Sequence, residues 1–109
     1  MKIKITEHQV QTQILTYLAY NHFKFWRNNT GMLIDRRGKP VRFGQVGSPD
    51  IMAIKGGKFY AIEVKSPIGK LSPAQASWLT EAQEYGAVVI VAHSFDEFLE
   101  QIKSVKFLS

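Results

Sequence analysis

The sequence contains no cysteine, and this absence excludes disulfide bonds, zinc–thiolate sites and thiol nucleophiles. Histidine is scarce: His8, His22 and His93 lack the spacing of metal ligands, and we interpret each as an ordinary surface or satisfied histidine. No apolar run approaches the length of a transmembrane helix, and Met1–Ile5 lacks the apolar run of a signal peptide. Repeats, low-complexity segments and linkers are also absent from the sequence. We therefore expect a soluble, intracellular protein with no membrane partner.

The 109 residues present are enough for a single domain, 1–109, with one hydrophobic core. Hydrophobic residues make up 45% of the chain, so we expect it to fold rather than remain disordered. Basic residues exceed acidic ones, which gives a net charge of +5 and a pI near 9.6. This excess favours an anionic partner, nucleic acid first.

Three helices are predicted from capping boxes, in which a Ser or Thr cap is followed three positions later by Gln or Glu. The caps and their partners are Thr6 with Gln9, Ser72 with Gln75 and Ser94 with Glu97. Strands are predicted at 23–27, 51–54, 59–65 and 87–92, and residues 32–43 suggest a loose hairpin or an extended flap. The apolar run 87–92 follows a strand and a helix, so we expect it to run parallel to 59–65. The predicted fold is α/β, with a mixed central β-sheet flanked by α-helices.

The central hairpin places acidic residues opposite each other. If Gly56-Gly57 forms a two-residue turn, the strand register puts Asp50 directly opposite Glu63. The alternation of side chains along a strand then puts Lys65 on the face of Glu63. Facing carboxylates repel each other, so their apposition needs a reason, and a bound divalent cation is the simplest one. Val64 points to the opposite, core-facing side, but its main-chain carbonyl can lie at the sheet edge and bind the same ion.

Two helices can bring further groups to this hairpin. Glu7 begins the apolar stripe of the first helix, which suits either a favourable helix-dipole position or a carboxylate at the edge of a site. Gln75 lies on the buried face of the second helix, where its amide can point to the sheet or serve as the reciprocal cap of Ser72. Gly47 precedes Asp50 and permits close approach of a ligand to the backbone.

Positive residues concentrate in the predicted flap. Arg36, Arg37, Lys39 and Arg42 fall within seven positions, and Ser48 and Lys70 flank the predicted hairpin. A solvated loop explains such a charge run about half the time. Beside an acidic metal site, contact with a phosphate backbone is the better explanation, so we predict nucleic-acid contacts for these six residues.

Carboxylate oxygens with open water positions suit Mg²⁺ or Mn²⁺, which accept phosphate as a further ligand. Such an ion polarises a phosphoryl oxygen and generates hydroxide near neutral pH. A lysine within reach can orient the attacking water or offset transition-state charge. The set fits metal-assisted phosphodiester hydrolysis. The alternative, a hairpin with a surface Asp and an ordinary Glu–Lys pair, leaves the apposition of Asp50 and Glu63 unexplained.

The motifs resemble those of a known nuclease superfamily. Pro49-Asp50 followed by Glu63-Val64-Lys65 is similar to the PD-(D/E)XK signature. The longer pattern resembles the VRR-NUC family over roughly Ile5–His93, and the chain looks like its stand-alone, virus- or phage-type branch. The matching segments are Glu7, Gly47–Asp50, Ile62–Lys65, Leu71–Leu79 and Gly86.

The resemblance implies a restriction-endonuclease-like fold and roles for individual residues. The implied metal ligands are Glu7, Asp50, Glu63 and the main-chain carbonyl of Val64, and the implied catalytic residues are Asp50, Glu63, Lys65 and Gln75. It also implies a homodimer that acts on branched DNA without a small-molecule cofactor, in the cytoplasm of a bacterial cell or a phage-infected host.

Our leading hypothesis is a Mg²⁺- or Mn²⁺-dependent DNA endonuclease that acts on Holliday junctions or other branched DNA. Its dimer interface is sought in the strand Phe23–Trp26 or in the final helix. Three alternatives remain: a flap or nicking nuclease without junction preference, a non-catalytic DNA-binding module with a structural cation, and a basic interaction domain.

Overall fold

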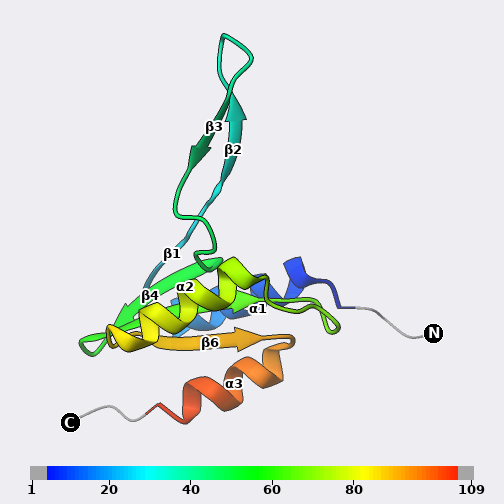
Figure 1. Cartoon of the computed structure of the whole chain (residues 1–109). Helices are drawn as coiled ribbons and strands as arrows, with labels where there is room; N and C mark the ends of the chain where they lie inside the picture. The colour runs from blue at the N-terminus through cyan, green and yellow to red at the C-terminus, as the bar shows by residue number, and fades with distance from the viewer. Residues whose placement is uncertain (1–4, 106–109) are drawn as a thin grey trace.

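A computed structural model describes residues 5–105 of the chain (Figure 1). The first four residues, used above in judging the absence of a signal peptide, lie outside the described range. The elements in order are α1 (Glu7–Tyr20), β1 (Lys24–Arg27), β2 (Gly31–Ile34), β3 (Pro40–Phe43), β4 (Ile51–Lys55), β5 (Lys58–Val64), α2 (Pro73–Glu84), β6 (Val88–Ala92) and α3 (Phe95–Lys103). Over residues 5–105, no helix is long and apolar enough to cross a membrane.

The main sheet has four strands in the order β1-β4-β5-β6. The β4–β5 hairpin has the predicted register, with Lys55 opposite Lys58 and Ile54 opposite Phe59. Gly56 and Gly57 form its turn with φ of 58° and 76°, a conformation that glycine adopts without steric cost. β1 pairs antiparallel with β4, and β6 pairs parallel with β5 as predicted. The predicted mixed sheet flanked by helices is therefore confirmed.

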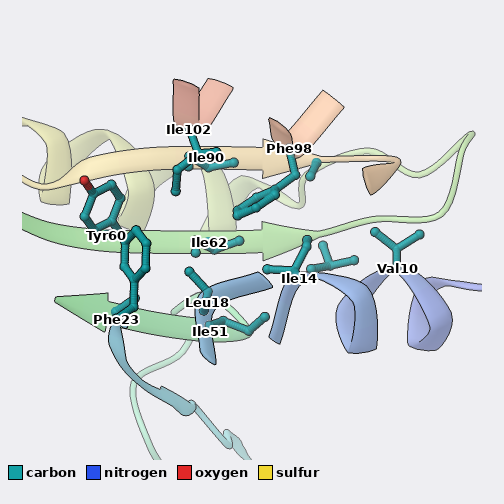
Figure 2. Close-up of a cluster of buried hydrophobic side chains, with 13 residues drawn as sticks. Val10, Ile14, Leu18, Phe23, Ile51, Tyr60, Ile62, Ile90, Phe98 and Ile102 are labelled. Atoms are coloured by element: carbon teal, nitrogen blue, oxygen red, sulfur yellow. The ribbon is translucent and has the colours of Figure 1, made fainter. Parts of the chain in front are cut away.

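The helices cover both faces of this sheet. The apolar stripe of α1 and the buried face of α3 pack on one face, and Figure 2 shows Ile14, Phe98 and Ile102 converging with Ile62 and Ile90. On the other face, Met52, Ala61 and Leu79 are buried but lie outside that cluster, which places α2 there (Figure 1). Alternation along β5 consequently directs Ile62 and Val64 toward α1 and α3, and Glu63 toward the α2 side.

Two of the three predicted capping boxes are complete. Thr6 with Gln9 and Ser72 with Gln75 each make both reciprocal hydrogen bonds. At α3 only one of the two hydrogen bonds of the box forms. In it, the Ser94 hydroxyl accepts from the backbone N–H of Glu97. The carboxylate of Glu97 instead faces Nδ1 of His93 at 3.0 Å. The predicted capping box of Ser94 and Glu97 was thus wrong about the reciprocal hydrogen bond from the Glu97 side chain.

β2 and β3 form a separate two-stranded antiparallel sheet, in which Gly31 pairs with Phe43 and Leu33 with Val41. Figure 1 shows that this hairpin stands away from the main sheet and its helices. We call residues 31–43 the arm. The predicted loose hairpin or flap is therefore a regular hairpin that projects from the body.

Candidate active site

Asp50 is fixed beside the end of β5 by both its main chain and its side chain. β4 begins at Ile51, opposite Ile62, so the preceding residue, Asp50, faces Glu63 as predicted. The Oδ2 atom of Asp50 accepts a hydrogen bond of 2.8 Å from the backbone N–H of Val64. Its carbonyl accepts another, also of 2.8 Å, from the N–H of Asn28. Asp50 therefore holds the strand end together, with its carboxylate beside that of Glu63.

Glu63 is the one buried charged residue among residues 5–105, with 3% of its surface exposed. Its Oε2 atom is buried and has no hydrogen-bond partner within that range. Burial is the main cause that raises the pKa of Glu63 to about 8. The Asp50 carboxylate adds to this, as a hydrogen-bond acceptor for the protonated form of Glu63 and as a like charge, although Lys65 acts in the opposite direction. At neutral pH the side chain consequently carries a proton unless another cation replaces it.

These two carboxylates fit a divalent cation. An ion beside them would neutralise the repulsion between Asp50 and Glu63 and provide the missing partner of Oε2. Hard oxygen donors of this kind suit Mg²⁺ or Mn²⁺. The side chain of Val64 is buried in the core on the opposite face, as predicted, and its main chain lies at this site through its N–H bond to Asp50.

Glu7 acts only weakly on this pair. Its side chain is exposed at the first turn of α1, and its charge is the smallest of the influences that raise the pKa of Glu63. Within the described part of the chain, no three Asp, Glu or His side chains come close enough together to hold a metal. The structure thus brings Asp50 and Glu63 together and leaves Glu7 at the periphery.

Lys65 is held between Glu63 and Gln75. Its Nζ atom lies 3.9 Å from Oε1 of Glu63 and donates a hydrogen bond of 2.7 Å to Oε1 of Gln75. The same Gln75 oxygen accepts the backbone N–H of Ser72 at 2.9 Å. The two roles considered for Gln75, reciprocal cap and sheet-directed amide, are therefore performed by one oxygen. This oxygen anchors the ammonium group of Lys65 to the start of α2.

Asn28, directly after β1, clamps the segment that leads into Asp50. Its Nδ2 atom donates to Oγ of Ser48 at 2.7 Å and to the carbonyl of Pro49 at 2.9 Å. Ser48 in turn donates to the carbonyl of Gln45. Because asparagine is common in turns, sequence alone gave no signal for this role. Asn28 positions Asp50 from the neighbouring strand.

Gly47 lets this segment approach α2 closely. Its φ is 85°, and a Cβ atom added there would lie 2.3 Å from the carbonyl oxygen of Ala74. Trp78 reinforces the contact, since its Nε1 donates to Oε1 of Gln45 at 2.7 Å. The glycine therefore sets the distance between the segment that carries Asp50 and the helix that carries Gln75.

His93 fastens the loop that follows Lys65. Its Nε2 lies 2.9 Å from the carbonyl of Gly69, and its Nδ1 lies 3.0 Å from a carboxylate oxygen of Glu97. The hydrogen bond to Glu97 is the main cause that raises the pKa of His93, and that to Gly69 adds to it, against an opposing effect of burial. The sequence-based interpretation as a satisfied histidine agrees with these two contacts.

The predicted nucleic-acid contacts fall into separate groups. Arg36, Arg37 and Lys39 lie at the tip of the arm, where the Asp35 carboxylate accepts the backbone N–H groups of Arg37 and Lys39. Arg42 lies on β3 and Lys70 in the loop before α2, and both are exposed. Ser48 is engaged in the contacts with Asn28 and Gln45. The tip of the arm stands away from the main sheet that contains β4 and β5 (Figure 1).

Comparison with known proteins gives one match. The family model of the VRR-NUC domain matches residues 6–96, a range that includes both carboxylates, Lys65 and Gln75. No curated protein and no solved structure matches the chain.

Proposed function

The chain belongs to the VRR-NUC family, whose domain implies a nuclease that acts on DNA, and we propose from this that it is a divalent-metal-dependent DNA endonuclease. The observation that carries the metal dependence is the buried Glu63, which faces Asp50 and has an unpartnered oxygen. A buried, ionised carboxylate without a partner destabilises the fold, and a bound cation offsets that cost.

Asp50 and Glu63 are the proposed principal ligands of Mg²⁺ or Mn²⁺, with the carbonyl of Val64 as a further ligand and Glu7 at the periphery of the site. The bound ion would supply Lewis-acid polarisation of the phosphate and hydroxide near neutral pH. Asp50 is positioned for this by Val64 and Asn28, and Glu63 is positioned by its strand. Releasing the proton from Glu63 makes it a ligand and restores its attraction for Lys65.

Lys65 is the proposed catalytic cation. Gln75 holds its ammonium group beside Glu63, so the group need not be ordered during the reaction. From that position Lys65 donates hydrogen bonds to the scissile phosphate or to the attacking water and offsets the negative charge that develops. Gln75 contributes by fixing the direction of this ammonium group.

The proposed substrate is branched DNA, with the four-way junction foremost, and the proposed active form is a homodimer of the single domain 1–109. One monomer offers one carboxylate pair, whereas resolving a junction takes two cuts, and a two-fold dimer supplies two related sites. Arg36, Arg37, Lys39, Arg42 and Lys70 would contact phosphates, and Ser48 would do so from the segment before Asp50. A flap or nicking nuclease is the second candidate within the same chemistry.

The proposal is tested by incubating the purified chain with labelled linear, flap and four-way-junction DNA in the presence of Mg²⁺, Mn²⁺ or EDTA. We expect metal-dependent cleavage, lost by about 10²–10³-fold in Lys65→Ala and in Asp50→Asn. Lys58→Ala, at the opposite end of β5, is the matched control and should cleave like the native chain. Binding to DNA without cleavage in either metal would contradict the nuclease and support a binding module.

A further inference from the structure

The arm exposes apolar side chains on both of its faces. The register puts Leu33, Val41 and Phe43 on one face, and Met32 and Ile34 on the other with Arg42. The exposed fractions are Met32 56%, Leu33 65%, Ile34 64%, Val41 49% and Phe43 41%. A solvent-exposed hairpin normally has at least one polar face. The polar residues of the arm lie mainly at its tip, so the composition of its strands is typical of a buried hairpin.

Contacts within the chain do not provide this burial. Within residues 5–105, the arm forms a two-stranded sheet of its own, so the outer edges of β2 and β3 have no strand partner. Its clearest internal packing is the Phe43 ring over Gly31, where an added Cβ atom would lie 2.7 Å from the ring. An isolated hairpin is marginally stable in water, and exposed apolar edges promote association. The exposed apolar side chains of the arm therefore indicate that another surface covers them.

Nucleic acid matches the strands of the arm poorly. DNA presents a polyanionic backbone, and proteins that use apolar contacts with it insert single wedges between base steps. The arm has one cation, Arg42, on its strands and keeps Arg36, Arg37 and Lys39 at its tip. Apolar residues on both faces of two strands fit a protein surface, while the tip remains available for phosphate.

The size of the patch suits a second copy of the chain. The five side chains together reach the ~300–600 Å² that the largest apolar patch of a typical monomer covers. If the second copy covers both faces of each arm, the two arms together bury on the order of 1,200 Å², the lower range of specific, stable interfaces. The two regions in which the interface was sought offer less: within the described residues, β1 contributes one exposed large hydrophobic side chain, Trp26, and α3 contributes none.

The base of the arm is shaped to receive such a partner. Thr30, Gly31, Met32, Arg42, Phe43 and Val46 line a hollow of about 290 Å³. In a two-fold, antiparallel arrangement, the aliphatic side chains of one arm lie over the base of the other. Leu33, on the same face of the arm as Val41 and Phe43, is therefore suited to fill the hollow of the second copy, and each copy contributes both a projection and a hollow.

We propose that the arm is the dimerisation element of this protein, exchanged with the arm of a second copy across a two-fold axis. The assignment rests on the homodimer of the proposed function and adds the surface that forms it. It also links the dimer to the active site, because the arm begins three residues after Asn28 and ends seven residues before Asp50. Those two residues are hydrogen-bonded to each other.

The test is the molar mass of the full chain in solution, measured by sedimentation or light scattering over a range of concentrations without metal or DNA. We expect the native chain at twice 12.4 kDa and Leu33→Thr/Val41→Thr at 12.4 kDa. Threonine retains strand propensity, so the arm itself should persist. Ile68→Thr removes a still more exposed aliphatic side chain (92%) from a loop away from the arm and should leave the dimer intact.

A second variant, Leu33→Lys/Val41→Glu, replaces the apolar pair with a cross-strand ion pair and should also be monomeric, with an unchanged circular dichroism spectrum. A native chain that is monomeric throughout would overturn the proposal, as would arm variants that remain dimeric, including variants that only lose DNA binding. Cleavage by the native chain is measured on the same preparation. A native chain that is monomeric and cleaves DNA would refute the proposed role of the arm and leave the proposed nuclease function standing. A native chain that is an inactive dimer, and that the arm variants dissociate, would support the role of the arm and contradict the nuclease function.

Discussion

Glu63 shows how a single residue can connect stability, pH and function. Its position in β5 places it on the α2 side of the sheet, where 3% exposure and the facing Asp50 raise its pKa to about 8. In the unfolded chain the same carboxyl group titrates near 4.5. Because the folded-state pKa is raised, the protonated form favours folding. Its contribution to stability is fully present below pH 4.5 and is lost as the pH rises to about 8.

We therefore predict that Glu63→Gln stabilises the metal-free protein at pH 8. Glutamine imitates the protonated carboxyl group and removes the cost of a buried charge. In EDTA the variant should unfold at least about 4 °C above the native chain at pH 8, which corresponds to roughly 1 kcal/mol in a domain of this size. At pH 4.5 the two should unfold together, as thermal melts can show.

Glu81→Gln, on the exposed surface of α2, controls for the change from acid to amide and should show no such pH-dependent gain. A Glu63→Gln variant that is less stable than the native chain at both pH values would show that Glu63 is ionised and satisfied in the fold.

Gln75 combines a structural and a catalytic task, and a matched pair of variants separates them. Ser72→Ala and Gln75→Ala both break the capping box, so each should lose about 1 kcal/mol of unfolding free energy. Gln75→Ala also releases Lys65, and we expect its DNA cleavage to fall a further 10- to 100-fold. Ser72→Ala should retain cleavage. Equal activity in two equally destabilised variants would assign Gln75 to the cap alone.

At the scale of elements, the active site depends on how closely the segment 44–50 packs against α2. Gly47 and Gly57 both have positive φ, at 85° and 76°, but differ in their surroundings. A Cβ atom at Gly57 meets nothing within 4 Å, whereas one at Gly47 meets the Ala74 carbonyl at 2.3 Å. Substitution of Gly57 therefore tests backbone strain alone, whereas substitution of Gly47 also tests the close packing of segment 44–50 against α2.

We predict that Gly57→Ala costs about 1–2 kcal/mol through strain alone and leaves Mn²⁺ affinity unchanged. Gly47→Ala should cost more than Gly57→Ala and should also weaken Mn²⁺ binding, because the segment that carries Asp50 must move away from α2. Urea denaturation and Mn²⁺ titration of the two variants measure these effects. Equal losses, with Mn²⁺ affinity intact in both, would show that the contact with α2 does not set the site.

Local sequence signals predicted most of the elements. Capping residues located the starts of all three helices, and Gly56-Gly57 set the register that puts Asp50 opposite Glu63. Long-range relations were missed, because they arise from tertiary contacts that leave no local pattern. Examples are the clamp by Asn28, the approach of Gly47 to Ala74 and the diversion of Glu97 to His93.

At the scale of the whole molecule, the fold class and the family followed from the sequence, whereas the spatial separation of the basic residues did not. Their closeness to Asp50 in sequence suggested a flap over the acidic site. The structure places three of them at the tip of an arm that extends from the body (Figure 1). A hairpin that pairs with itself carries its turn away from its base, so closeness in sequence does not imply closeness in space.

The central claim is that the buried pair of Asp50 and Glu63 is a divalent-cation site. Calorimetric titration of the native chain with Mn²⁺ at pH 7, in two buffers of different ionisation enthalpy, tests it most directly. We predict binding with release of about one proton, since Glu63, with its pKa near 8, must ionise to bind the ion. Glu63→Gln should bind at least about 10-fold more weakly and release none. Absence of binding by the native chain, or binding that releases no proton and persists in Glu63→Gln, would contradict the claim.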